Sequence, residues 1–130
     1  MIKSEDDFHL LIGSYLNINE VNLKKRGLIY WTYSPAGELR NKLIAIKLKR
    51  KGVKKGDADY RLEFVKNNIQ YTGYFEIKFG KNKLTKEQKQ IFELREKIKN
   101  TKCYTCYSFE EFEDSLNNFL KFIEICQKEF

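Results

Sequence analysis

The chain has 130 residues, 42% of them hydrophobic and 15% aromatic, which excludes wholesale disorder and suffices for one domain over residues 1–130. Its 25 basic residues against 18 acidic ones give a formal net charge of +7, which favours a polyanionic partner, a nucleic acid or an anionic membrane surface. It lacks an apolar run of about 18 residues, a signal-peptide pattern and enough cysteines for a disulfide scaffold, so we expect a cytoplasmic protein, bacterial or in the host cell if viral.

The first half of the chain is predicted to form a helix, a strand and a second helix. Apolar residues recur at helical spacing over 5–16, behind Ser4 as the capping residue, and an aromatic strand follows at 28–33. A break at 34–37, which contains proline and glycine, precedes a helix at 39–51.

The second half of the chain is predicted to contain three strands and two helices. These are strands at 60–66 and 71–79, a helix to about residue 99 behind a capping box at Thr85–Gln88, a strand at 102–107, and a terminal helix behind Ser108. The resulting order α-β-α-β-β-α-β-α predicts an α/β (α+β) fold, in which helices pack on a small mixed sheet.

The strands at 60–66 and 71–79 form a predicted hairpin that gathers charged residues. Strand alternation places Asp59, Glu76 and Lys78 on the face opposite the apolar residues. A two-residue turn at Asn67-Asn68 sets Asp59 opposite Glu76, with Cβ atoms roughly 4.5–5.5 Å apart. Two carboxylates so close repel each other unless a cation lies between them, and Mg²⁺ suits such oxygen ligands. The alternative is a weak ion pair on a solvated strand face.

Several short segments around this hairpin form an ordered set along the chain. They are Glu5, Ser34-Pro35-Ala36-Gly37 followed by Arg40, the Gly-Val-x-x-Gly-x-Ala-Asp of 52–59, the Glu-x-Lys of 76–78, and the run from Gly80 to Gln88. This set resembles the VRR-NUC domains of the PD-(D/E)XK nuclease superfamily over most of the chain. The chain departs from the family pattern at Ala58, where proline is usual, and at Ala36, where asparagine is usual.

The resemblance implies a restriction-endonuclease-like PD-(D/E)XK fold and a metal-dependent endonuclease that hydrolyses DNA. Stand-alone members of this size are phage and bacterial enzymes that act as homodimers on branched DNA, such as four-way (Holliday) junctions. Mg²⁺ or Mn²⁺ would then be held by Asp59, Glu76 and the backbone carbonyl of Ile77. Lys78 would orient the attacking water or stabilise the transition state.

Two further residues receive catalytic roles from the resemblance. Gln88 would hold the site together from the third helix, although it also fits as the capping partner of Thr85. Glu5 would approach the metal through water, although it also fits as an acidic first-turn residue favoured by the helix dipole. Asp57 shares the parity of Asp59 and is a rival ligand, and Glu63 is expected to be solvated.

Basic residues flank the hairpin and are expected to contact DNA phosphates, or to form a solvated surface. Those assigned to DNA binding are Arg40, Lys54, Lys55, Lys81 and Lys83. Two other functions remain open: a non-catalytic nucleic-acid-binding module on the same fold, and a basic protein that binds an acidic protein partner.

Two other kinds of residue are expected to lie outside the chemistry. Cys103 and Cys106 form a C-x-x-C pair, but they lie in a strand without a second pair, so we expect buried, reduced thiols and no zinc site. His9 is expected on the surface of the first helix.

Overall fold

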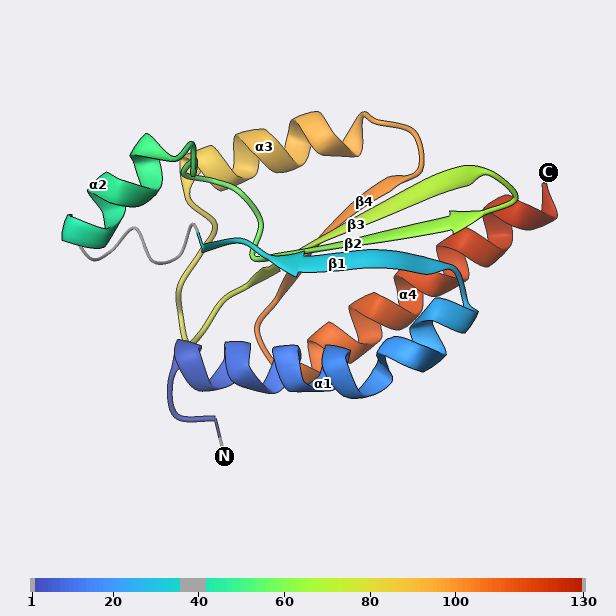
Figure 1. Ribbon diagram of the computed structural model, residues 1–130, viewed down its shortest axis with the longest axis horizontal. Helices are drawn as coiled ribbons and strands as arrows, with labels where there is room; N and C mark the ends of the chain where they lie inside the picture. Colours follow the sequence, from blue (N-terminus) through green and yellow to red (C-terminus); the bar gives the residue numbers. More distant parts are fainter. Residues whose placement is uncertain (1, 36–41, 130) are drawn as a thin grey trace.

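A computed structural model describes residues 2–35 and 42–129, and the predicted order of elements is confirmed over these ranges. The elements, shown in Figure 1, are α1 (Glu5–Lys25), β1 (Leu28–Tyr33), α2 (Lys42–Arg50), β2 (Tyr60–Lys66), β3 (Ile69–Ile77), α3 (Lys86–Glu96), β4 (Thr101–Cys106) and α4 (Phe109–Lys128). The predicted start of the second helix at residue 39 falls outside the described residues.

The strands form one mixed sheet in the order β1-β2-β3-β4. The first three strands are antiparallel neighbours, and β4 runs parallel to β3 after the α3 crossover. Asn67 and Asn68 have φ angles of 51° and 63°, as a two-residue hairpin turn of this kind requires. This turn pairs Lys66 with Ile69, so the predicted register of the hairpin is confirmed.

Helices α1 and α4 cover one face of the sheet, and α3 lies on the other, as Figure 1 shows. The core lies between the sheet and the α1–α4 pair, where Phe8 and Ile12 of α1 meet Phe112 and Phe119 of α4. Gly73 of β3 permits this close packing, because an added Cβ would lie 3.0 Å from the Phe119 ring. The charged face of the hairpin therefore points away from the core, toward α3.

The largest difference from the predicted elements is the length of α1, which continues to Lys25 instead of ending at residue 16. The apolar residues Ile18 and Val21 in this extension are exposed, so they do not continue the amphipathic pattern that predicts a helix. Leu23 is buried and ties the last turn to the core, while Lys24 and Lys25 suit the negative end of the helix dipole.

Smaller differences concern the ends of other elements. Strand β3 begins and ends two residues earlier than predicted, which leaves Lys78 just beyond the strand. Helix α3 ends at Glu96 rather than near residue 99. No helix in the described part of the chain is long and apolar enough to cross a membrane.

Candidate active site

Three charged side chains are buried together where the hairpin ends. Register places Tyr60 opposite Phe75, and the next residues outward are Asp59 and Glu76. The residues Asp59, Glu76 and Lys78 are only 6%, 3% and 8% exposed. Charged residues are seldom buried unless they are paired or bind a ligand. The alternative of a solvated ion pair on an exposed strand face is therefore wrong.

The Asp59 carboxylate is fixed by the backbone of the opposite strand. The Ile77 N–H donates a hydrogen bond of 2.7 Å to Asp59 Oδ2. The backbone carbonyl of Asp59 accepts a 2.8 Å hydrogen bond from the Ser34 N–H, which ties β2 to the end of β1. The side chain of Asp59 is thus hydrogen-bonded to the backbone of Ile77, and both residues are predicted metal ligands.

The Glu76 carboxyl group has one satisfied oxygen and one without a partner. Gln88 Nε2 donates a 3.1 Å hydrogen bond to Glu76 Oε1. The other oxygen, Oε2, is buried and, in the ionised carboxylate, has no hydrogen-bond donor among the described residues. A buried acceptor without a donor costs free energy, and a bound cation would satisfy it.

Burial raises the pKa of the Glu76 carboxyl well above its ordinary value of 4.5. When it is protonated, Glu76 hydrogen-bonds with Asp59; this bond and the charge of Asp59 raise the pKa further, and the charge of Glu5 adds to the effect. The Lys78 ammonium acts in the opposite direction and lowers the pKa. Without a metal the pair therefore favours one shared proton, and a divalent cation would favour both ionised carboxylates.

Gln88 both caps α3 together with Thr85 and donates a hydrogen bond to Glu76. Its Oε1 accepts a 2.8 Å hydrogen bond from the Thr85 N–H, and its own N–H donates to Thr85 Oγ1 at 3.2 Å, so the capping box is confirmed. Its Nε2 simultaneously contacts Glu76. The start of α3 is thus joined to the buried carboxylates through one side chain.

Glu5 and Lys78, the two remaining residues with predicted catalytic roles, lie at the same end of the sheet as Asp59 and Glu76. Glu5 lies in the first turn of α1, and its charge acts on Glu76 across the end of the sheet. Lys78 is held by a 2.9 Å hydrogen bond from its N–H to the Cys106 carbonyl at the end of β4. The structure therefore gathers Glu5, Asp59, Glu76, Lys78 and Gln88 at one end of the sheet.

The rival ligand Asp57 is engaged elsewhere. Its Oδ1 forms an ion pair of 3.0 Å with Arg95 Nη2, and its side chain is 41% exposed, unlike the buried Asp59. Glu63 was expected to be solvated, but its Oε1 lies 3.4 Å from Arg61 Nε and its side chain is only 23% exposed. Strand alternation places Arg61 and Glu63 on one face of β2, so this neighbour could have been inferred from the sequence.

The donor set at the carboxylate pair suits a hard divalent cation. Asp59 and Glu76 supply carboxylate oxygens, one of them without a partner, and Mg²⁺ commonly takes its remaining ligands from water and substrate phosphate. Within residues 2–35 and 42–129, no cluster of three or more His, Cys, Asp or Glu side chains has the geometry to hold a metal. A cation here would therefore depend on these two carboxylates, the Ile77 carbonyl and exogenous oxygens.

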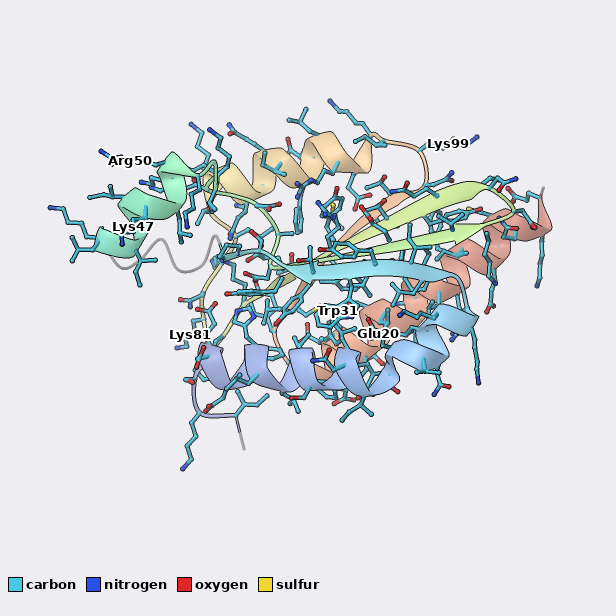
Figure 2. All side chains as sticks on the ribbon, in the orientation of Figure 1. Glu20, Trp31, Lys47, Arg50, Lys81 and Lys99 are labelled. Atoms are coloured by element: carbon cyan, nitrogen blue, oxygen red, sulfur yellow. The ribbon has the colours of Figure 1, made fainter. Side chains whose placement is uncertain are left out.

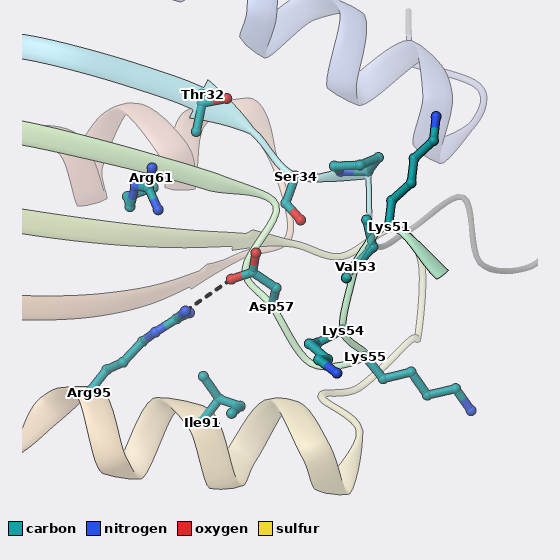
Figure 3. A pocket seen from close by; sticks show the side chains of 12 residues that line it. Thr32, Ser34, Lys51, Val53, Lys54, Lys55, Asp57, Arg61, Ile91 and Arg95 are labelled. Carbon is teal, nitrogen blue, oxygen red and sulfur yellow. Dashed lines mark hydrogen bonds and ion pairs between the residues drawn. The ribbon is translucent and has the colours of Figure 1, made fainter. Parts of the chain in front are cut away.

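The residues assigned to DNA binding are distributed around this end of the sheet. Lys54 and Lys55 line a pocket that also includes Asp57 and Arg61 (Figure 3), and Lys81 and Lys83 are exposed in the loop after β3. Figure 2 shows Lys81 near the start of α1, at the same end of the molecule as α2. Arg40 falls outside the described residues.

Two arginines in the same pocket were missed by the sequence analysis. Arg61 shares the strand face of Asp59 and lies two residues further along β2, so alternation could have identified it. Arg95 follows Gln88 by two helical turns, which places both on the same face of α3. Only tertiary packing shows that this face is turned toward Arg61.

The expectation for His9 is wrong. Its ring is partly buried, packs edge-on against Tyr33, and lies 3.3 Å through Nδ1 from the Tyr60 hydroxyl. That hydroxyl also donates a 3.0 Å hydrogen bond to the His9 carbonyl. His9 therefore helps fix α1 to the sheet next to Asp59.

The cysteines are free thiols, but of the C-x-x-C pair only Cys106 is buried as expected. Cys106 is buried, and burial raises the pKa of its thiol to about 11, while a hydrogen bond to Ser115 lowers it. Cys103 is half-buried and donates its backbone N–H to Glu96 Oε1 at 2.9 Å. Both cysteines lie within β4, where their contacts are with neighbouring parts of the fold.

Comparisons with family models, curated proteins and solved structures find no match for this chain. The chemistry of the site therefore has to be inferred from its own residues.

Proposed function

We propose that the chain is a metal-dependent endonuclease that hydrolyses DNA phosphodiester bonds on a PD-(D/E)XK fold. The carrying observation is the buried Asp59–Glu76 pair with its unpartnered Glu76 oxygen. The element order α-β-α-β-β-α-β-α, with β4 parallel to β3 beside three antiparallel strands, supports the fold that the sequence motifs imply. Asp59, Glu76 and the Ile77 carbonyl would hold Mg²⁺ or Mn²⁺.

A bound divalent ion would lower the pKa of a water molecule and neutralise charge on the scissile phosphate. Lys78 lies within electrostatic reach of Glu76 and would orient that water or stabilise charge on the phosphate. Gln88 fixes the orientation of the Glu76 carboxyl group. Glu5 would hold water from the α1 side of the site.

The substrate class follows from the motif resemblance. We propose branched DNA such as a four-way junction, cut by a homodimer, because a two-fold enzyme matches a substrate with paired strands. The excess of basic residues supports a polyanionic substrate.

A cleavage assay tests the nuclease. The purified chain is given a labelled four-way junction, a splayed flap and a plain duplex, with Mg²⁺, Mn²⁺ or EDTA. We expect cleavage with either metal, none with EDTA, and a loss of at least about 100-fold in Glu76→Gln. The control Glu93→Gln removes an exposed charge from α3 and should retain activity.

Three results would count against this function. Cleavage in EDTA would exclude the metal, and full activity in Glu76→Gln would exclude the site. Salt-sensitive DNA binding without cleavage of any substrate would instead favour a non-catalytic nucleic-acid-binding module.

A further inference from the structure

A basic pocket lies between the sheet and α3 (Figure 3), on the sheet face that also carries Asp59 and Glu76. Its volume is about 530 Å³, and it is bounded by the ends of β1 and β2, the loop that precedes β2, and α3. Its cations are Lys51, Lys54, Lys55, Arg61 and Arg95. The Thr32 and Ser34 residues complete one wall.

Both arginines of this pocket are neighbours of Tyr74. Arg61 is the cross-strand partner of Tyr74, and the Arg95 guanidinium carbon lies 3.9 Å from the centroid of the Tyr74 ring. Tyr74 thus supports the Arg95 guanidinium plane and is also the cross-strand neighbour of Arg61. Figure 3 shows Arg61 entering from β2 and Arg95 from α3.

Each arginine retains donors that the protein does not use. Arg61 Nε and Arg95 Nη1 are buried and have no hydrogen-bond partner among the described residues. Buried donors of this kind are costly unless a ligand accepts from them. A guanidinium group carries five N–H donors in a planar fork, which matches the oxygens of a phosphate.

The acidic neighbours only partly offset this charge. Asp57 pairs with Arg95 Nη2 at 3.0 Å, and Glu63 Oε1 lies 3.4 Å from Arg61 Nε, in a geometry that does not form a hydrogen bond. The pocket lining thus holds five cations and one carboxylate, Asp57, with Glu63 beside Arg61. This balance favours an anionic ligand.

We propose that this pocket binds a phosphate group of the nucleic-acid strand, next to the phosphate that lies at Asp59 and Glu76. Arg61 follows Asp59 by two residues on one strand face, a separation of about 6.6 Å, which suits a neighbouring phosphate rather than the same one. The assignment of this neighbour as the cleaved phosphate rests on the proposed function. Arg61 and Arg95 would position the strand for the reaction.

The test measures DNA binding in EDTA, where cleavage cannot interfere. Fluorescence anisotropy is recorded at several salt concentrations for wild type, Arg61→Gln, Arg95→Gln and the control Lys99→Gln. The control makes the same charge change on an exposed residue beyond the end of α3 (Figure 2). We expect each pocket variant to bind about tenfold more weakly, with a salt slope lower by about one, and the control to bind like wild type.

A fourth variant distinguishes loss of the binding site from misfolding of the protein. Asp57→Asn removes the carboxylate that competes for Arg95, so it should tighten DNA binding several-fold. If the ion pair were only structural, this variant would lose thermal stability and would not bind more tightly. Circular dichroism melts of all variants separate the two effects.

The oligonucleotides identify which phosphate is bound. Equal losses on hydroxyl-ended and phosphate-ended strands indicate an internal phosphodiester, whereas losses confined to phosphate-ended strands indicate a terminal phosphate. Both results support the pocket. The proposal is overturned if Arg61→Gln and Arg95→Gln bind like Lys99→Gln, or if Asp57→Asn fails to tighten binding. These readouts need no cleavage, so they stand apart from failure of the nuclease.

Discussion

The Glu76 side chain is placed where its ionised form destabilises the metal-free fold but suits a bound cation. Its carboxyl group is buried beside a second carboxylate, and one oxygen has no donor. Both features destabilise the metal-free fold when the group is ionised. Such a cost is common where a site is arranged for a ligand that supplies the missing charge.

Removal of this charge should stabilise the metal-free protein at neutral and higher pH. The folded-state pKa of Glu76 lies above its ordinary value of 4.5, so the folded state holds a proton that the unfolded state releases. This contribution to stability is complete below pH 4.5 and is lost as the pH rises toward the folded-state pKa. In EDTA, Glu76→Gln should therefore be more stable than wild type at pH 8, and the difference should shrink toward pH 5.

Urea unfolding between pH 5 and 8.5 checks this prediction. The control Glu93→Gln changes an exposed carboxylate on α3 and should follow the wild-type profile. Parallel profiles for wild type and Glu76→Gln would contradict a raised pKa in the folded state.

Metal addition should stabilise the protein through the same residues. Millimolar Mn²⁺ or Mg²⁺ binds the folded state only, so we expect the melting temperature to rise by about 3 °C or more. The Asp59→Asn variant lacks one ligand charge and should show little shift in differential scanning fluorimetry. An equal rise in both proteins would place the metal elsewhere.

At the level of elements, α3 is joined to the site by the Thr85–Gln88 capping box. Two roles for Gln88 were open from the sequence, and the structure gives it contacts for both. The sequence predicts the cap from local spacing. The contact with Glu76 depends on where the crossover places α3, which local spacing does not determine.

Two variants separate the capping role of this pair from its role at the site. Thr85→Ala removes the N-cap hydroxyl and should cost about 1 kcal/mol of stability with little effect on cleavage. Gln88→Ala also frees Glu76 Oε1, so its cleavage rate should fall by about tenfold or more. Urea melts and single-turnover cleavage give the two readouts, and equal cleavage losses would reduce Gln88 to a capping residue.

Other elements show why some features could be predicted and others could not. The Asn67-Asn68 turn fixes the hairpin register locally, so the pairing of Asp59 and Glu76 followed from sequence. The last turns of α1 could not be predicted, because their apolar residues are mostly exposed and Leu23 is held by distant core residues. The pocket could not be predicted either, because Arg61 and Arg95 meet only when α3 packs against the sheet.

At the scale of the whole molecule, the two faces of the sheet serve different purposes. The α1–α4 face is close-packed around Phe75 and Phe119, whereas the α3 face holds the charged residues and the pocket. Dense packing on one face fixes the sheet, and the other face is left free to present polar groups.

A pair of glycine variants tests the packing of the core face. Gly73→Ala would place a Cβ 3.0 Å from the rings of Phe75 and Phe119, so we expect a loss of about 1–3 kcal/mol. Gly13→Ala lies within α1, where an added Cβ meets no described atom within 4 Å, and should instead stabilise by about 0.5–1 kcal/mol. Thermal melts check both, and a neutral Gly73→Ala would contradict the tight packing of α4 on β3.

The short hairpin turn also bears on how the chain folds. Asp59 and Glu76 are brought together by a local connection, which closes faster than contacts between distant segments. Their repulsion would therefore act while the chain is still collapsing, before α3 docks. A proton or a divalent ion that relieves it would then accelerate folding as well as slow unfolding. The residues proposed for chemistry would in this way also set the kinetic barrier by which the protein reaches its native state.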